Sequence, residues 1–82
     1  MRLSRVSAID DLISAEMILR GFQKSEERPG HWRSKGGYGH DLEFRHRTVA
    51  NWIKHDFEAG GPEGALRKLR AKVDFVIEKQ VR

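Results

Sequence analysis

The sequence contains no cysteine, which excludes disulfide bonds and thiolate metal sites. It also has no long apolar run: nothing approaches the roughly 18 consecutive apolar residues that a membrane span needs. Near the N-terminus, Asp10 and Asp11 interrupt the apolar stretch that a signal peptide would require. These absences predict a cytoplasmic protein that does not enter the membrane.

The excess of positive charge is concentrated in the middle of the chain. The 82 residues, enough for one small domain, carry a net charge of +4. Residues 28–55 contain six Lys or Arg against Asp41 and Glu43, so this segment alone accounts for the whole net charge. It also contains all four histidines, both tryptophans and the only tyrosine. Such a basic segment favours an acidic partner, either nucleic acid or an acidic protein surface.

We expect an α+β fold dominated by helix, with three helices at about 7–25, 48–59 and 62–81 and a small β-hairpin at about 31–46. Apolar residues at helical spacing, including Ile9 and Ile13, indicate the first helix. Gly21 costs about 1 kcal/mol relative to Ala inside a helix. The first helix could therefore end or bend at Gly21, which would leave the next few residues extended.

The hairpin prediction is based on a change of pattern after residue 30. Residues 31–35 and 41–46 flank a glycine-rich turn, and Leu42 and Phe44 alternate with polar residues as in a half-buried strand. Because an isolated hairpin is only marginally stable, we expect Trp32, Leu42 and Phe44 to pack on the helices. The alternative is an all-α fold in which residues 28–46 form an irregular basic loop.

A glycine-rich break separates the last two predicted helices. Gly60 suits the position just after a helix, and Pro62 suits the first turn of the next one. Apolar residues of the helix at 62–81 recur at the a and d positions of two heptads. Packing on the protein's own core is favoured over a dimer seam, and a homodimer through residues 62–81 is the alternative. The expected core contains Ile9, Leu12, Ile13, Leu19, Leu42, Phe44, Val49, Trp52, Ile53, Leu66, Leu69, Val73 and Val76.

No catalytic or cofactor-binding motif is present. The sequence has no nucleophile elbow, phosphate-binding glycine loop or dinucleotide fingerprint. The four histidines, at positions 31, 40, 46 and 55, match neither the i, i+4 spacing of helical metal sites nor the spacing of zinc fingers. Asp41 and Glu43 could act as an acid/base pair, but neighbouring arginines make salt bridges the simpler explanation. We therefore expect no enzyme activity, no cofactor and no metal site.

The basic segment does combine the residue types that nucleic-acid contact needs. Lysine and arginine bind phosphates, whereas flat and forked side chains contact bases. Trp32 is expected in the core, and Tyr38, flanked by glycines, is the more exposed aromatic. The expected contact residues are Arg28, His31, Arg33, Lys35, Tyr38, Arg45, Arg47, Asn51 and Lys54.

Residues 47–66, RTVANWIKHDFEAGGPEGAL, resemble the helix-turn-helix segments of transposase-type DNA-binding domains. The resemblance covers about a quarter of the chain, and it is based on Thr48, Val49, Trp52, Phe57, Gly60, Gly61 and Leu66. It implies that residues 48–58 form a recognition helix, in which Asn51 is suited to a bidentate contact with adenine. The side chains that would then face the DNA groove are Thr48, Asn51, Lys54 and His55.

Two functions agree with these patterns. The first is a small basic regulatory domain that binds nucleic acid through the hairpin and the helix after it. The alternative is an inhibitor or adaptor of the phage type, which would bind an acidic or nucleic-acid-binding surface of a larger protein complex. Arginine and aromatic residues are enriched at protein interfaces as well. Convergence of the basic side chains on one face of the fold would favour the first function.

Overall fold

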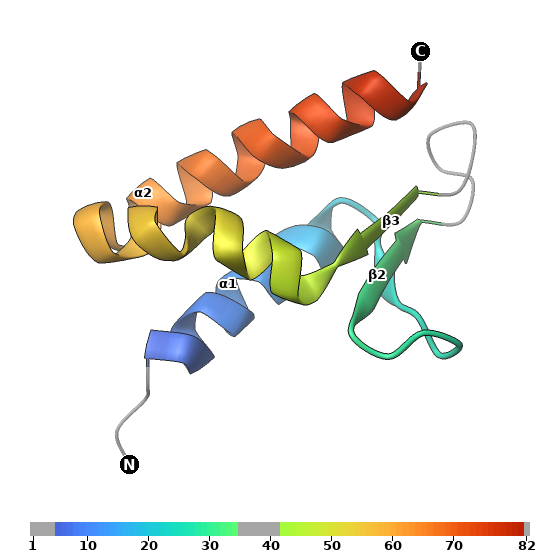
Figure 1. Cartoon of the computed structure of the whole chain (residues 1–82), viewed down its shortest axis with the longest axis horizontal. Coiled ribbons are helices and arrows are strands. Elements are labelled where there is room, and N and C mark those ends of the chain that lie inside the picture. Colours follow the sequence, from blue (N-terminus) through green and yellow to red (C-terminus); the bar gives the residue numbers. More distant parts are fainter. Residues whose placement is uncertain (1–4, 35–41, 82) are drawn as a thin grey trace.

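The computed structural model of the chain describes residues 5–34 and 42–81. Along the chain these residues form a helix, three strands and a second helix (Figure 1). The strands make one antiparallel sheet in the order β1-β2-β3. The α+β class is therefore confirmed, and the all-α alternative is wrong because residues 28–46 include two paired strands. The bounds are α1 Arg5–Leu19, β1 Gln23–Lys24, β2 His31–Ser34, β3 Leu42–Arg45 and α2 His46–Val81.

Helix α1 ends at Leu19 rather than near residue 25, because Gly21 closes it. Gly21 has a φ of 88°, a left-handed conformation that glycine adopts at little cost. The Gly21 N–H donates to the Ile18 carbonyl at 2.9 Å and the Phe22 N–H donates to the Met17 carbonyl at 2.9 Å. This pair of bonds is a Schellman motif. It turns the chain so that Phe22 is buried beside Met17 and the following residues are extended as β1.

The hairpin predicted at 31–46 is present as β2 and β3. The two strands are antiparallel, with Trp32 opposite Phe44 and His31 opposite Arg45. Trp32 and Phe44 point into the core, whereas His31 and Arg45 lie on the more exposed side. The short strand β1 adds to the other edge of β2, with Lys24 opposite Trp32. The inner face of β2 and β3 is thus mostly apolar, with Ser34 also buried, and the opposite face is polar and charged, as the period-2 pattern requires.

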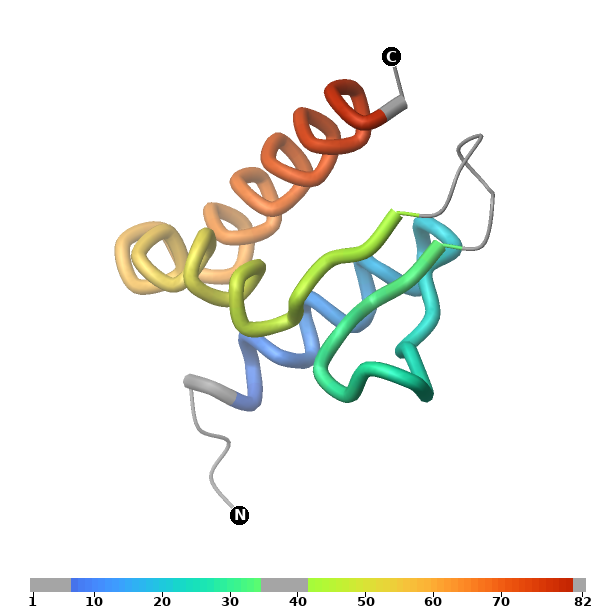
Figure 2. Tube along the Cα trace, turned by 45° about the vertical axis from the view of Figure 1, so that its right-hand side comes forward, coloured from blue at the N-terminus to red at the C-terminus, as the bar shows by residue number. Residues whose placement is uncertain are grey.

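The described residues contain two helical elements rather than the three predicted, because α2 runs from His46 to Val81 without an intervening loop. The break predicted at Gly60 and Pro62 is present within α2 as a kink. Gly61 is non-helical, with φ 67° and ψ −164°, and Pro62 follows directly. Gly61 alone reverses the direction of the chain, so no loop separates the two parts of α2. Figures 1 and 2 show α2 turning back on itself. Residues 46–60 are called the first arm below, and residues 62–81 the second arm.

The adjacent glycines allow a direct test of this reversal. The backbone angles of Gly61 lie in a region that is essentially restricted to glycine, whereas Gly60 has no such angles, and a Cβ at either position would meet nothing within 4 Å. We expect Gly61→Ala to lower the free energy of unfolding by about 1–3 kcal/mol. The matched change Gly60→Ala should raise it by up to about 1 kcal/mol. Urea denaturation measures both, and equal midpoints for the two variants would contradict the assignment.

The core joins both helices and the inner face of the sheet. Its buried members are Ile9, Ile13, Met17, Phe22, Trp32, Leu42, Phe44, Val49, Ile53, Ala65, Leu69 and Val73. The predicted burial of Trp32 is confirmed, since only 2% of it is exposed. Leu19 was wrongly placed in the core: it is 74% exposed, because the turn at Gly21 brings in Phe22 instead. The packing of the second arm on the protein's own core is also confirmed, through Leu69 and Val73.

Within residues 5–34 and 42–81, neither helix combines the length and the apolar character that crossing a membrane would demand.

Candidate functional site

A pocket of about 500 Å³ lies where the sheet meets the start of α2. It forms because β3 passes directly into α2, so that residues 45–47 leave the strand and begin the helix at the same place. The N–H of His46 donates to the carbonyl of Gly30 at 2.8 Å, which holds the turn before β2 against the first turn of α2. The pocket is lined by Asp10, Ser14, Lys24, Pro29, Gly30, His31, Trp32, Arg45, His46 and Arg47.

A chain of hydrogen bonds through three elements builds the inner wall of this pocket. Trp32 Nε1 donates to His46 Nδ1 at 3.0 Å, and His46 Nε2 lies 2.8 Å from Asp10 Oδ1. An indole nitrogen can only donate, so Nδ1 of His46 must be the acceptor. Nε2 therefore carries the proton and donates it to Asp10. This arrangement fixes the tautomer of His46 and links α1, β2 and α2.

Three cations surround the opening of the pocket. Lys24 places its Nζ 5.5 Å from the centre of the Trp32 ring, a cation–π geometry. Arg45 and Arg47 are exposed, and neither forms an ion pair with another residue in the described part of the chain. No acidic residue occupies the first turn of α2, so the partial positive charge of the helix N-terminus adds to theirs. The opening is accordingly electropositive.

The predicted contacts on the first arm continue from the pocket. Arg47, Asn51 and Lys54 are separated by four and three residues, which places them on one side of a helix, and all three are exposed. With a rise of 1.5 Å per residue, Arg47 and Lys54 are about 10 Å apart along the axis. Because Arg47 also lines the pocket, the pocket and this side of the arm form one surface. We call Lys24, His31, Arg45, Arg47, Asn51 and Lys54 the basic face.

Two other predicted contacts, Arg28 and Arg33, are paired with carboxylates and do not line this pocket. Arg28 Nη1 lies 2.8 Å from Glu43 Oε1, and Arg33 Nη1 lies 3.2 Å from Glu27 Oε2. A phosphate would have to compete with these acids for the guanidinium groups. The structure thus brings together part of the predicted set and separates the rest. Lys35 and Tyr38, also predicted as contacts, lie outside the described residues.

Sequence reasoning missed Lys24 and the Asp10–His46–Trp32 chain. Asp10 and His46 are 36 positions apart, and Trp32 and His46 are 14 apart. Only the folded arrangement of α1, β2 and α2 brings these positions together. The one signal in the sequence was the position of His46 at the junction between the predicted strand and the predicted helix.

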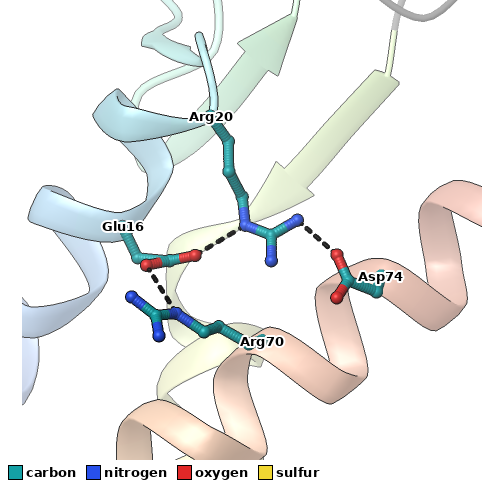
Figure 3. A network of polar contacts seen from close by, with 4 residues as sticks. All are labelled: Glu16, Arg20, Arg70 and Asp74. Carbon is teal, nitrogen blue, oxygen red and sulfur yellow. Dashed lines mark hydrogen bonds and ion pairs between the residues drawn. The ribbon is translucent and has the colours of Figure 1, made fainter.

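A second polar cluster joins α1 to the second arm of α2 (Figure 3). Glu16, only 5% exposed, is 2.7 Å from Arg20 Nε and 3.3 Å from Arg70 Nε, and Arg20 also reaches Asp74 at 2.6 Å. Burial alone would lower the pKa of Arg20, but its hydrogen bonds to Asp74 and Glu16, together with their charges, outweigh burial and raise that pKa. Arg20 therefore remains charged at any ordinary pH. Because two guanidinium groups pair with the Glu16 carboxylate, the cluster serves as a structural link between α1 and the second arm rather than as a reactive site.

Comparison with known proteins gives no relative for this arrangement. No protein-family model, curated protein or solved structure matches the chain. The resemblance of residues 47–66 to helix-turn-helix segments stays a prediction; these residues lie entirely within α2, and β3 precedes that helix directly. In the segments 5–34 and 42–81, no group of three His, Asp or Glu side chains is arranged to hold a metal ion.

Proposed function

We propose that this protein binds nucleic acid through the basic face. The observation that carries the proposal is the grouping of Lys24, Arg45 and Arg47 around one pocket, with Asn51 and Lys54 continuing the surface along the first arm. Phosphate binding needs several cations that converge, because each contact releases a counterion from the nucleic acid. The role we infer is that of a small regulatory domain whose affinity depends on phosphate contacts.

The ion pairs of Arg28 and Arg33 favour Arg45 and Arg47 as the arginines that bind phosphate. Arg45 and Arg47 have no carboxylate partner among the residues that the structure describes, so a phosphate gains their charge without breaking an ion pair within residues 5–34 and 42–81. Arg28 and Arg33 would first have to leave Glu43 and Glu27. Asn51 adds a forked donor and acceptor that suits adenine. We therefore assign phosphate binding to the basic face and only a minor contribution to Arg28 and Arg33.

The proposal gives a quantitative salt dependence. Contacts from Lys24, Arg45, Arg47 and Lys54 would give a slope of log affinity against log salt of about −3 for single strands and about −4 for duplex. Between 50 and 200 mM salt, the affinity should then fall roughly 50-fold for single strands and roughly 150-fold for duplex. Fluorescence anisotropy with labelled 20-nucleotide single strands and duplexes measures this. No binding at 50 mM salt, or an affinity that does not change with salt concentration, would refute the proposal.

A further inference from the structure

We propose that the pocket receives the terminal phosphate monoester of a nucleic-acid strand, so that the protein prefers phosphorylated strand ends. This inference rests on the proposed nucleic-acid binding and specifies the group that occupies the pocket. The lining of the pocket has an excess of positive charge. Lys24, Arg45 and Arg47 oppose the single carboxylate of Asp10, which leaves an excess of two positive charges with the histidines counted as neutral. A phosphate monoester carries about −1.5 to −2 at neutral pH, whereas an internal phosphodiester carries only −1.

The inner wall does not offer a surface for stacking a base. Trp32 is only 2% exposed, its Nε1–H is already bonded to His46, and Lys24 lies over its ring. A nucleobase could therefore not use the indole face, which is the usual aromatic platform in single-strand binding. The groups that the pocket does offer are cationic and polar. A volume of about 500 Å³ is several times that of a phosphate group, which leaves room for the sugar that carries it.

The walls of the pocket favour a strand end over a strand that passes through. On the α1 side the lining consists of Asp10 and Ser14, and the Asp10 side chain is 49% exposed. A strand that continued past this wall would bring its next phosphate close to a carboxylate. Away from α1, Arg47 leads to Asn51 and Lys54 along the first arm. A strand that ends in the pocket and leaves along the arm meets the cations Arg47 and Lys54 and the neutral Asn51.

The test compares four 12-nucleotide single strands of one mixed sequence: with a 5′-phosphate, with a 3′-phosphate, with both, and with hydroxyl groups at both ends. Affinities are measured by competition against one labelled strand at 100 mM salt. We expect at least one kind of terminal phosphate to increase affinity about tenfold, because the monoester adds about −1.5 to −2 charges and three acceptor oxygens opposite the cations of the pocket. Equal affinity of all four strands, within twofold, would overturn the inference while leaving the proposed function intact. Failure of every strand to bind would overturn both.

Two variants separate the pocket from the arm. Lys24→Ala removes a cation that lines the pocket and does not belong to the first arm, so the preference for phosphorylated ends should fall to about twofold or less. Lys54→Ala removes a cation from the arm, outside the pocket, so all strands should weaken by a similar factor and the preference should persist. Both side chains are exposed, and thermal melting confirms that each variant is folded. A preference that survives Lys24→Ala unchanged would contradict the assignment of the terminal phosphate to this pocket.

Discussion

Replacement of Trp32 by Ala is expected to lower the free energy of unfolding by about 3–5 kcal/mol. Trp32 is the largest fully buried side chain, it stands opposite Phe44 in the sheet, and it donates the hydrogen bond that orients His46. The truncation removes apolar volume and leaves a cavity together with an unsatisfied imidazole nitrogen. A chain of this length has a total stability of roughly 4–12 kcal/mol. The loss is therefore a large fraction of the total, and near the lower end of that range most of the variant population should be unfolded at 37 °C.

Two further variants separate packing from hydrogen bonding at Trp32. Trp32→Phe keeps most of the apolar volume and loses the bond to His46, so the expected loss is about 1–2 kcal/mol. Phe75→Ala removes an aromatic ring that is 56% exposed and should change stability by no more than about 0.5 kcal/mol. Urea denaturation monitored by circular dichroism measures all three. A Trp32→Ala midpoint close to that of Phe75→Ala would show that the indole is not part of the core.

Replacement of Glu16 by Ala is expected to cost about 2–4 kcal/mol, the second largest effect. The Glu16 carboxylate is 5% exposed and pairs with Arg20 and Arg70. Removal of one member of a buried ion pair leaves the other charge uncompensated, which costs more than the pair itself contributes. Arg20, with 17% of its side chain exposed, would keep only Asp74 as a carboxylate partner within the cluster. The link between α1 and the second arm of α2 should weaken accordingly.

Asp74 provides the matched control within the same cluster. Its side chain is 65% exposed although it lies 2.6 Å from Arg20, and exposed ion pairs contribute little because water screens them. Asp74→Ala should therefore cost less than about 1 kcal/mol. Thermal melting of the two variants at low salt compares them directly. Equal losses for Glu16→Ala and Asp74→Ala would mean that burial of the Glu16 carboxylate has no energetic consequence.

Local patterns in the sequence predicted the parts of the fold that depend on neighbouring residues. The alternation at Leu42 and Phe44 predicted β3, and Gly60 and Pro62 predicted the position of the break in the helical chain. The end of α1 was predicted less well, because the Schellman motif at Gly21 depends on burial of Phe22. The exposure of Leu19 follows from the same turn. Helical spacing alone gave no reason to exclude Leu19 from the core.

The pocket could not be predicted, because its lining comes from α1, β1, the turn before β2, β2 itself and the junction of β3 with α2. Charge and composition did identify Arg45, Arg47 and Lys54, but not their separation from Arg28 and Arg33. That separation depends on the ion pairs with Glu43 and Glu27. These pairs arise because the turn between β1 and β2 brings Arg28 close to Glu43 of β3 and Glu27 close to Arg33 of β2. These contacts cannot be derived from a count of charges along the chain.

The most direct test of nucleic-acid binding by the basic face compares two double variants that lose the same charge. Arg45→Ala/Arg47→Ala removes the two exposed arginines of the pocket, whereas Arg67→Ala/Lys72→Ala removes two exposed cations of the second arm that do not line the pocket. The measurement is the affinity for a 20-base-pair duplex as a function of salt. We expect the first variant to bind about 10- to 100-fold more weakly at 50 mM salt, with a slope of log affinity against log salt reduced by about 2. The second should stay within about threefold of the wild type, and equal losses in both variants would contradict a localised binding face.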